Sequence, residues 1–442
     1  MLRSLGQLSR SSQLRFYSCT NYARMFDDGE PLPVSFEDVS RAAFRIRGGI
    51  HRTHCDKSAF LSELCGSNIY LKKDFMQYTG SFKERGARNS LLSLGEKAKS
   101  TGVITASAGN HALALSYHGK LLGIKVTCVM PTTAPITKVE LCRKIGAEVI
   151  LQGQHIGEAK EFAMNEYPDT PYINGYDDPE IIAGAGSMGI EIVEQVPDID
   201  VVLVPVGGGG LIAGVSLAMK TLRPNCEVIG IEPENVASYA AAIAAGKPVD
   251  GFKAATLADG LAVPIVGGHS FKVARRYVDY TTTVSEKMIA LAVLRLIEME
   301  KIVVEGGGAT SLAPILPGGP LHGKFQNKNV CLLLCGGNID TTVLGRVIDR
   351  GLAADDRLIR FIATVSDRPG GIATLSKDMA DIGVSIKDIY HERAWLHSRV
   401  DQVMVKCVVE TTGKEHSERM YAYLEEKGYM LTKGGEEVYN VG

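Results

Sequence analysis

The sequence has little excess charge and no long apolar run. Its 48 Lys and Arg residues nearly cancel its 50 Asp and Glu residues, leaving a formal net charge of -2. A chain without a basic excess lacks the electrostatic footprint of nucleic-acid or anionic-membrane binding. No apolar stretch reaches the roughly 20 residues that cross a bilayer. We expect a soluble protein that binds neither nucleic acid nor membrane.

Cysteine pairs and early acidic residues are also missing. The nine cysteines include no C-x-x-C pair and no group with histidines at zinc spacing, which favours a reducing compartment. Asp27 is the first acidic residue, and four arginines precede it among Ser, Leu and Gln, as in an organellar transit peptide. We predict that residues 1–26 are a mitochondrial transit peptide or else a disordered tail on a cytoplasmic protein.

Glycine is abundant, with 48 residues concentrated where apolar, strand-like segments end. A chain of 442 residues suits two or three domains. Five nearly continuous apolar segments alternate with helical patterns between Asp38 and Arg350, which is typical of a parallel sheet covered on both faces. The predicted strands are Val103–Thr105, Val126–Met130, Val201–Val206, Val228–Ile231 and Val330–Leu334. The predicted helices are His111–Leu122, Thr137–Ile145, Ile182–Gln195 and Leu211–Thr221. The sequence therefore predicts an α/β fold.

After Gly351 the pattern changes to a βαββα order. The predicted elements are strands Arg360–Val365, Val384–His391 and Gln402–Val409 and helices Gly371–Asp381 and Glu415–Lys427. This order predicts a separate ferredoxin-like domain over residues 358–436, joined by a polar linker, Ala353–Arg357.

The segment Thr79–Gly86 (T-G-S-F-K-E-R-G) predicts the start of a helix. Ser81 and Glu84 have the spacing of a capping box, which would place Lys83 in the first helical turn. The positive end of a helix and partial burial disfavour the ammonium form, and a free amine is what Schiff-base formation requires. A capped helix with a solvated lysine explains the same residues.

Two further segments each join an apolar strand to a helix. Ser107–His111 would offer backbone amides and the Asn110 side chain to a carboxylate or phosphate, although a plain turn capped by Asn110 is equally consistent. Gly207–Gly210 leaves four unobstructed N–H groups, which suits a phosphate.

Two alternatives concern these strand ends. Gly208, Gly210 and Ala213 also fit a dinucleotide fingerprint, with Glu232 near the expected position of its ribose-binding acid. In C-G-G-N, Cys335 follows an apolar strand and would face the ligand crevice of an open α/β sheet, or else be a small buried residue.

Together and in this order, the motifs S-F-K-x-R-G, S-A-G-N-H-A, G-G-G-G-L and C-G-G-N resemble the threonine/serine dehydratase and serine racemase family. The resemblance covers residues 36–350. It implies a pyridoxal-phosphate-dependent catalytic domain of the tryptophan-synthase-β-like fold (fold type II). It also implies deamination of L-threonine to 2-oxobutanoate, with L-serine as a second substrate, and a homo-oligomer.

The resemblance also implies roles for individual residues. Lys83 would hold the cofactor covalently, with Phe82 packed beside its ring and Asn110 bonded to its phenolic oxygen. Gly207, Gly208, Gly209 and Gly210 would bind its phosphate, and Cys335 would face the pyridine nitrogen. Ser107, Ala108, Gly109, Asn110 and His111 would hold the substrate carboxylate.

Three positions carry finer expectations. Racemases of this family have a serine where this chain has Ala108, which favours a dehydratase over a serine or threonine racemase. Glu232 and Ser238 match side-chain positions that bind a cation in the family, and Ser238 suggests a monovalent one.

The stretch Phe361–Ile372 resembles an ACT domain, with Asp367, Gly370 and Gly371 at its ligand-binding turn. It implies allosteric control by an amino acid, or else a domain used only for oligomerisation. An NAD-dependent enzyme and a catalytically silent amino-acid sensor are the alternatives from other classes, and the Lys83 motif argues against both.

Overall fold

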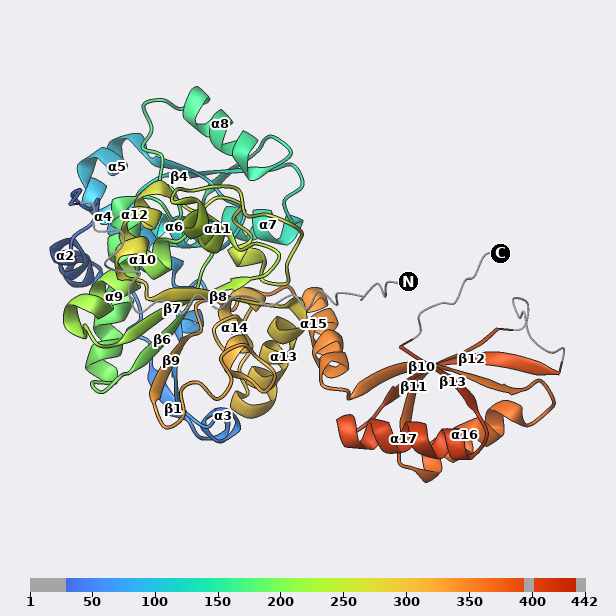
Figure 1. The fold of residues 1–442 in the computed structure, drawn as a ribbon. Helices are drawn as coiled ribbons and strands as arrows, with labels where there is room; N and C mark the ends of the chain where they lie inside the picture. The colour runs from blue at the N-terminus through green and yellow to red at the C-terminus, as the bar shows by residue number, and fades with distance from the viewer. Residues whose placement is uncertain (1–28, 393–400, 435–442) are drawn as a thin grey trace, which may run out of the picture.

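The computed structural model describes residues 29–392 and 401–434, which form two regions (Figure 1). The larger one carries the predicted Lys83 motif and is named the catalytic region after that prediction, and the smaller one is the C-terminal region. The predicted transit segment, residues 1–26, lies outside the described residues. No helix in the described part of the chain is both long and apolar enough to cross a membrane.

The catalytic region is built on a six-stranded sheet of order β1-β2-β9-β6-β7-β8. Only β1 runs antiparallel to its neighbour. The strands are β1 (Cys55–Ser58), β2 (Asn68–Lys72), β6 (Val201–Pro205), β7 (Glu227–Pro233), β8 (Tyr280–Val284) and β9 (Asn329–Leu333).

Both faces of this sheet are covered, as its apolar strands predict. Val202 and Val204 of β6 belong to a core with α2 (Phe36–Ile46), α9 (Pro179–Gln195), α10 (Gly210–Leu222) and α12 (Gly268–Tyr277). Val201 and Leu203 belong to a second core with α3 (Ala59–Cys65) and α13 (Glu286–Arg295). Alternating side chains of one strand therefore stabilise opposite layers.

A separate parallel sheet, β3-β4-β5, forms a second lobe. It consists of β3 (Val103–Ala106), β4 (Val126–Met130) and β5 (Glu148–Leu151). Helices α4 (Lys83–Leu94), α6 (Asn110–Leu122) and α7 (Ile136–Ile145) share its main core, while α5 (Glu96–Thr101) precedes β3 and α8 (Ile156–Glu166) covers the other face. The predicted strands and helices are present, but the alternation of apolar segments did not indicate that they divide between two sheets.

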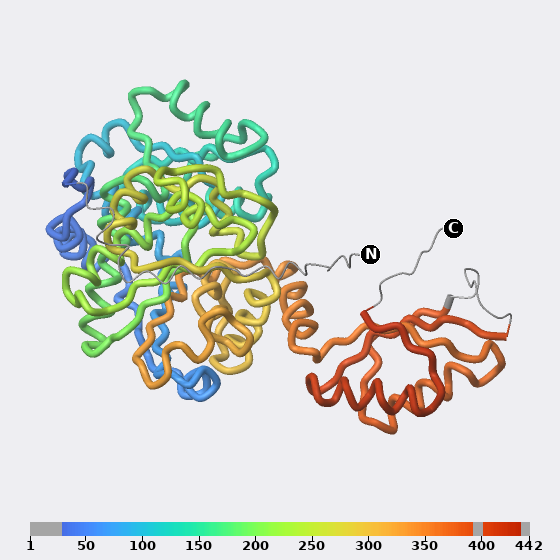
Figure 2. Tube along the Cα trace, viewed as in Figure 1, coloured from blue at the N-terminus to red at the C-terminus, as the bar shows by residue number. Residues whose placement is uncertain are grey.

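Helix α15 (Thr341–Ala354) leads the chain from the catalytic region to the C-terminal region, as Figure 2 shows in orange. The predicted linker began at Ala353, but the helix continues through Ala354. Asp355 and Arg357 then join an ion-pair cluster with Arg295 and Glu298, so this connection is anchored rather than free.

The C-terminal region is a four-stranded antiparallel sheet of order β11-β12-β10-β13 with two helices. Its elements are β10 (Leu358–Ser366), α16 (Gly371–Asp381), β11 (Ser385–Glu392), β12 (Gln402–Glu410), α17 (Lys414–Glu426) and β13 (Met430–Lys433). The element order along the chain is βαββαβ. Strand β13 was not predicted, because four partly polar residues carry too little periodicity.

Candidate active site

Helix α4 begins at Lys83, but not in the predicted way. Phe82 is the N-cap residue and makes no side-chain cap, so the Ser81–Glu84 capping box was wrong. Ser81 instead forms a β-bridge with Gly336, and the Phe82 amide donates to the Cys335 carbonyl at 2.9 Å. This pairing holds Ser81 away from the cap position and joins the lysine motif to the C-G-G-N motif.

The Lys83 amine lies in an enclosed setting although the whole side chain is only half-buried. Its Nζ donates to the Gly175 carbonyl at 2.5 Å and lies 5.0 Å from the centroid of the Phe82 ring. Burial lowers the pKa of this amine to about 8, against the opposing effects of Cys335 and Glu305. About a tenth of the amine is therefore uncharged at pH 7 and about half at pH 8, and this uncharged form is the nucleophile.

Asn110 connects the second lobe to the large sheet. It begins α6, but Gly109 is the N-cap and no side chain caps the helix, so the simple capping role for Asn110 was wrong. Its Nδ2 donates to Glu305 at 2.8 Å, and its Oδ1 accepts from Asn338 at 2.9 Å. Asn338 also donates to the Thr79 carbonyl at 2.7 Å. Three distant segments therefore converge beside Lys83.

Two titratable side chains at this junction are shifted by burial. The pKa of Glu305 rises to about 7 because the carboxylate is desolvated and Asp259 repels it, although the Asn110 hydrogen bond acts the other way. Desolvation and the Lys83 charge lower the pKa of His111 to about 3. His111 is therefore neutral at physiological pH. Perturbed groups of this kind often mark a functional site.

The glycine loop lies between β6 and α10. Gly209 has a φ of 94°, and a Cβ at Gly208 would lie 2.3 Å from the Tyr176 ring. A Cβ at Gly210 would lie 2.5 Å from the Tyr176 carbonyl oxygen. Tyr176 follows Gly175, the residue that Lys83 contacts, so the loop and the lysine share one neighbouring segment. The first amides of α10 have no acceptor within the helix and can bind an anion.

Cys335 lies just beyond the carboxyl end of β9 and is buried. Its Sγ lies 3.7 Å from the Gly307 carbonyl oxygen. Burial raises the pKa of this thiol, with Glu305 acting in the same direction. The thiol is therefore neutral. Its position also shows that the site is assembled at strand ends, where open α/β sheets bind ligands.

Residues 46–336 match the family described as "Pyridoxal-phosphate dependent enzyme". The chain belongs to this family. It is 38% identical to an L-threonine ammonia-lyase of Thermotoga maritima over 398 residues, which covers 90% of this chain and 98% of that protein. The catalytic region is also similar to a processed threonine deaminase from Solanum lycopersicum (TM-score 0.67, 34% identity) and to a serine racemase from Dictyostelium discoideum (TM-score 0.65, 34% identity). These matches cover 71% and 70% of this chain and 91% and 99% of those chains.

Pyridoxal phosphate is the cofactor of this family, and the residues at the site fit it. Thr79 Oγ1, Ser81 Oγ and His111 Nδ1 are buried without a hydrogen-bond partner among the described residues. Unpaired buried polar atoms are costly and indicate a missing ligand or water. The glycine loop offers amides for a phosphate, and Lys83 offers an amine for the aldehyde carbon.

Glu232, at the end of β7, does not lie in this constellation. Its carboxylate accepts from the Tyr239 and Ala240 amides at 2.7 and 3.0 Å and from the Thr281 hydroxyl at 3.0 Å. It therefore binds the N-terminus of α11 (Ser238–Ala245), which leaves it poorly placed for a ribose and argues against the dinucleotide hypothesis. Burial raises the pKa of Glu232 to about 7.

Three residues of the site were not predicted, namely Gly175, Tyr176 and Glu305, and Asn338 was included only as the last residue of the C-G-G-N motif, without a role. Residues Asn174–Asp177 read N-G-Y-D, and Asn174 accepts hydrogen bonds from the amides of Tyr176 and Asp177. The turn-forming Asn-Gly pair could therefore have indicated this segment. The three glycines after Glu305 are a comparable signal. The contact of Gly175 with Lys83, and the contacts of Glu305 and Asn338 with Asn110, depend on tertiary packing.

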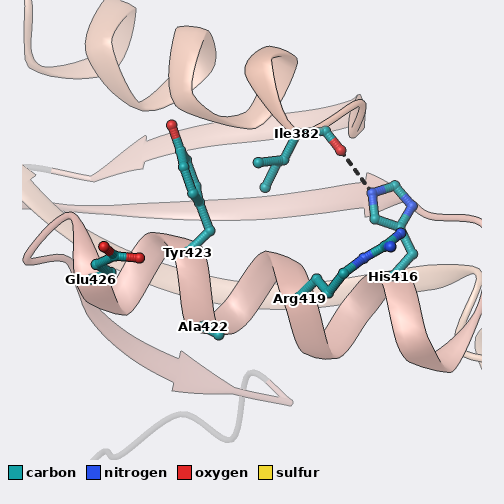
Figure 3. A pocket seen from close by; sticks show the side chains of 6 residues that line it. All are labelled: Ile382, His416, Arg419, Ala422, Tyr423 and Glu426. Carbon is teal, nitrogen blue, oxygen red and sulfur yellow. Dashed lines mark hydrogen bonds between the residues drawn. The ribbon is translucent and has the colours of Figure 1, made fainter.

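A separate depression of about 440 Å³ lies in the C-terminal region, far along the chain from Lys83 (Figure 3). It is lined by Ile382, His416, Arg419, Ala422, Tyr423 and Glu426. The predicted effector-binding residues, Asp367, Gly370 and Gly371, do not line it. Figure 3 shows His416 of α17 bonded to the Ile382 carbonyl, at 2.9 Å, so this histidine joins α17 to the end of α16.

Proposed function

We propose that the protein is an L-threonine ammonia-lyase that converts L-threonine to 2-oxobutanoate and ammonia, and L-serine to pyruvate and ammonia. The observation that carries the proposal is the buried Lys83 amine, which donates to the Gly175 carbonyl beside the Phe82 ring and has its pKa lowered to about 8 by burial. The similarity of the chain to L-threonine ammonia-lyases over most of its length supports the same activity.

Bound pyridoxal phosphate supplies an electron sink that makes the Cα–H bond of an attached amino acid acidic. Lys83 and Phe82 would hold its ring, Gly207–Gly210 its phosphate and Asn110 its phenolic oxygen. Lys83 would then take up the Cα proton through the uncharged form of its amine, which the lowered pKa makes accessible near neutral pH. Cys335 would face the ring nitrogen as an uncharged thiol and could not stabilise a charge there, which favours loss of the β-hydroxyl over a long-lived carbanion.

The Ser107–His111 loop would hold the substrate carboxylate. It lies between β3 and α6, and residues 107–110 are only partly buried, so the first amides of α6 remain accessible. The Gly109 amide lies 3.4 Å from Ser107 Oγ, a long hydrogen bond that a carboxylate could replace. His111 stays neutral and lies 3.3 Å from the Ile173 carbonyl through Nε2, which orients its unpaired Nδ1.

The test is to incubate purified protein with pyridoxal phosphate and L-threonine and to measure 2-oxobutanoate and ammonia. Lys83→Ala should abolish product, while Lys73→Ala, which removes an exposed pair with Asp56, should not. Equal amounts of both products that disappear only in Lys83→Ala would support the proposal. A yellow protein without 2-oxo acid from threonine or serine would contradict it.

A racemase is the second candidate, because a solved serine racemase is 34% identical to this chain. Racemisation requires a proton donor on the face of the substrate opposite Lys83, and Ala108 offers none. Ala108→Ser should introduce measurable racemisation of L-serine in a chain that otherwise shows little. Rapid racemisation by the unchanged protein would favour the racemase instead.

We also propose a monovalent cation near Glu232 and Ser238. Ser238 Oγ is fully buried without a partner among the described residues, and the amide of the next residue, Tyr239, donates to the Glu232 carboxylate. No group of three or more His, Cys, Asp or Glu converges as a metal site in residues 29–392 and 401–434, so hydroxyl and carbonyl oxygens would complete the ligands. Activity that is the same in potassium and sodium would contradict this proposal.

The C-terminal region is proposed to be an ACT-like domain that binds an amino-acid effector at Asp367, Gly370 and Gly371. Gly370 has a φ of 101° and caps α16, which places these residues at a tight strand-to-helix turn. An amino acid that changes the rate in the full chain should lose its effect in Asp367→Ala. An unchanged response would leave oligomerisation as the role of the domain. Sedimentation of the full chain tests the predicted homo-oligomer.

Mitochondrial import through residues 1–26 remains a separate proposal. Mass spectrometry of the N-terminus of the native protein tests it, because import would remove the arginine-rich segment. An intact Met1 would contradict import and favour a cytoplasmic protein.

A further inference from the structure

Glu84 and His118 form a buried pair directly behind the lysine site. Glu84 follows Lys83 on α4, and His118 lies on α6, two turns after Asn110. The two helices pack against each other (Figure 1). His118 Nε2 lies 3.0 Å from Glu84 Oε2, and neither side chain is exposed. Burial of a carboxylate costs free energy unless each of its oxygens is hydrogen-bonded. Glu84 therefore depends on its hydrogen-bond partners.

Geometry indicates which ring nitrogen of His118 donates. Its Nδ1 lies 3.3 Å from a guanidinium nitrogen of Arg88, which can only donate hydrogen bonds. Nδ1 therefore accepts from Arg88, and Nε2 donates to Glu84. The ring is oriented by a hydrogen bond at each nitrogen.

The other oxygen of Glu84 accepts the Thr79 amide. The Thr79 carbonyl accepts from the side-chain amide of Asn338, which also lies 2.9 Å from Asn110 Oδ1. Hydrogen bonds therefore fix both the amide and the carbonyl group of Thr79. A continuous series of hydrogen bonds runs from Arg88 through His118, Glu84, Thr79 and Asn338 to Asn110.

We propose that Glu84 and His118 are positioning residues that fix the Thr79–Phe82 segment, and with it the separation between the Lys83 amine and the Asn110 side chain. The proposal rests on the cofactor-holding roles of Lys83 and Asn110 in the proposed function. A carboxylate is required at position 84 because both of its partners donate. Glutamine there would present its NH₂ group to one of two donors and lose that bond.

The test compares four variants. His118→Leu removes the donor, Glu84→Gln keeps the shape but loses one bond, and His118→Gln places an amide nitrogen near the former Nε2. Asn89→Ala is the control, because Asn89 is a buried residue of α4 whose amide binds Glu180, away from the site. Each is measured below its melting temperature for pyridoxal phosphate affinity, the absorbance of the cofactor–Lys83 linkage, and kcat and KM for L-threonine.

We expect His118→Leu and Glu84→Gln to lower kcat by about tenfold, as displacement of a reacting group by a fraction of an ångström does. The absorbance of the linkage should shift, and KM should change less than kcat. His118→Gln should retain most of kcat, and Asn89→Ala should lose thermal stability but not kcat. If His118→Leu does not fold, the isosteric Glu84→Gln is compared with Asn89→Ala in its place.

A purely structural role would overturn the proposal: His118→Leu and Glu84→Gln would then match Asn89→Ala, with a lower melting temperature and unchanged kcat and absorbance. Failure of the positioning role can be distinguished from failure of the proposed function. If the unchanged protein binds pyridoxal phosphate on Lys83 but does not deaminate threonine, the function fails, while absorbance and cofactor affinity still decide the positioning role. A protein that never forms the linkage overturns both.

Discussion

The catalytic region buries charged side chains that the C-terminal region keeps near its surface. Among the described residues, the buried charged side chains of the catalytic region are Lys72, Asp74, Glu84, Arg85, Glu232 and Glu305. In the C-terminal region Asp378, still 8% exposed, is the most buried carboxylate described, and the core is apolar. Burial of charge is costly, so its concentration around Lys83 shows where the fold accepts that cost for function or specificity.

A cluster beneath Lys83 illustrates the contrast. Arg85 binds Asp74 at 2.7 Å and Glu191 at 2.7 Å, and Lys72 binds Glu191 at 2.6 Å. Burial would raise the pKa of Asp74, but the charge and hydrogen bonds of Arg85 outweigh it and lower the pKa below its ordinary value. The bonds of Arg85 to Glu191 therefore tie α4 to α9.

The largest expected effect is from breaking this cluster. Asp74→Ala leaves the Arg85 guanidinium buried and short of a partner, which should cost about 3–5 kcal/mol of unfolding free energy. Because Arg85 is two residues from Lys83, kcat should fall as well. Chemical denaturation and threonine assays of the same preparation check both effects. Loss of stability with unchanged kcat would mean that the cluster does not support the site.

Phe361→Ala is the counterpart in the C-terminal region. Phe361 is fully buried in its core, and removal of the ring should destabilise that region by about 3–5 kcal/mol. We expect basal kcat to stay unchanged in the absence of an effector, because none of the residues described in this region contacts Lys83. Calorimetry and initial rates are the measurements. A parallel loss of kcat would show that the two regions are energetically one unit.

Gly208→Ala sharpens the comparison within the catalytic region. The new methyl would lie 2.3 Å from the Tyr176 ring, so the loop must shift and pyridoxal phosphate affinity should fall by about 10- to 100-fold. Gly345→Ala, on α15, is the matched control, because its Cβ would meet nothing within 4 Å. Fluorescence titration of the apoprotein measures affinity. Equal affinities in the two variants would remove the phosphate role of the loop.

The smallest effect is the pH dependence of cofactor uptake. Burial lowers the pKa of Lys83 from 10.5 to about 8, so the uncharged amine predominates above that pH. The rate of linkage formation in the apoprotein should rise about tenfold per pH unit below 8 and level off above it. Because the folded pKa is lowered, the stability that this group contributes falls as the pH drops from about 10.5 to about 8 and is absent below that range. Stopped-flow absorbance between pH 6 and 10 measures the rate, and a midpoint near 10.5 would contradict the enclosed amine.

Sequence patterns predicted most of the helices and strands well. The strand prediction Val126–Met130 agrees with β4 and the helix prediction Gly371–Asp381 with α16, because apolar periodicity and glycine stops act locally. The helix beginning near Lys83 was also predicted, but its capping box was not formed. Ser81 pairs instead with Gly336, more than 250 residues later in the chain, and local spacing carries no information about such a partner.

The sequence by itself determined the α/β alternation, the ferredoxin-like order at the C-terminus and the identity of the motif lysine, since each is written in neighbouring residues. Tertiary structure alone decided that the strands divide into two sheets. It also decided that Glu305 and Asn338 meet Asn110, and that Glu232 binds a helix terminus. These outcomes depend on desolvation and hydrogen bonds between segments distant in the chain, which only the folded packing brings together.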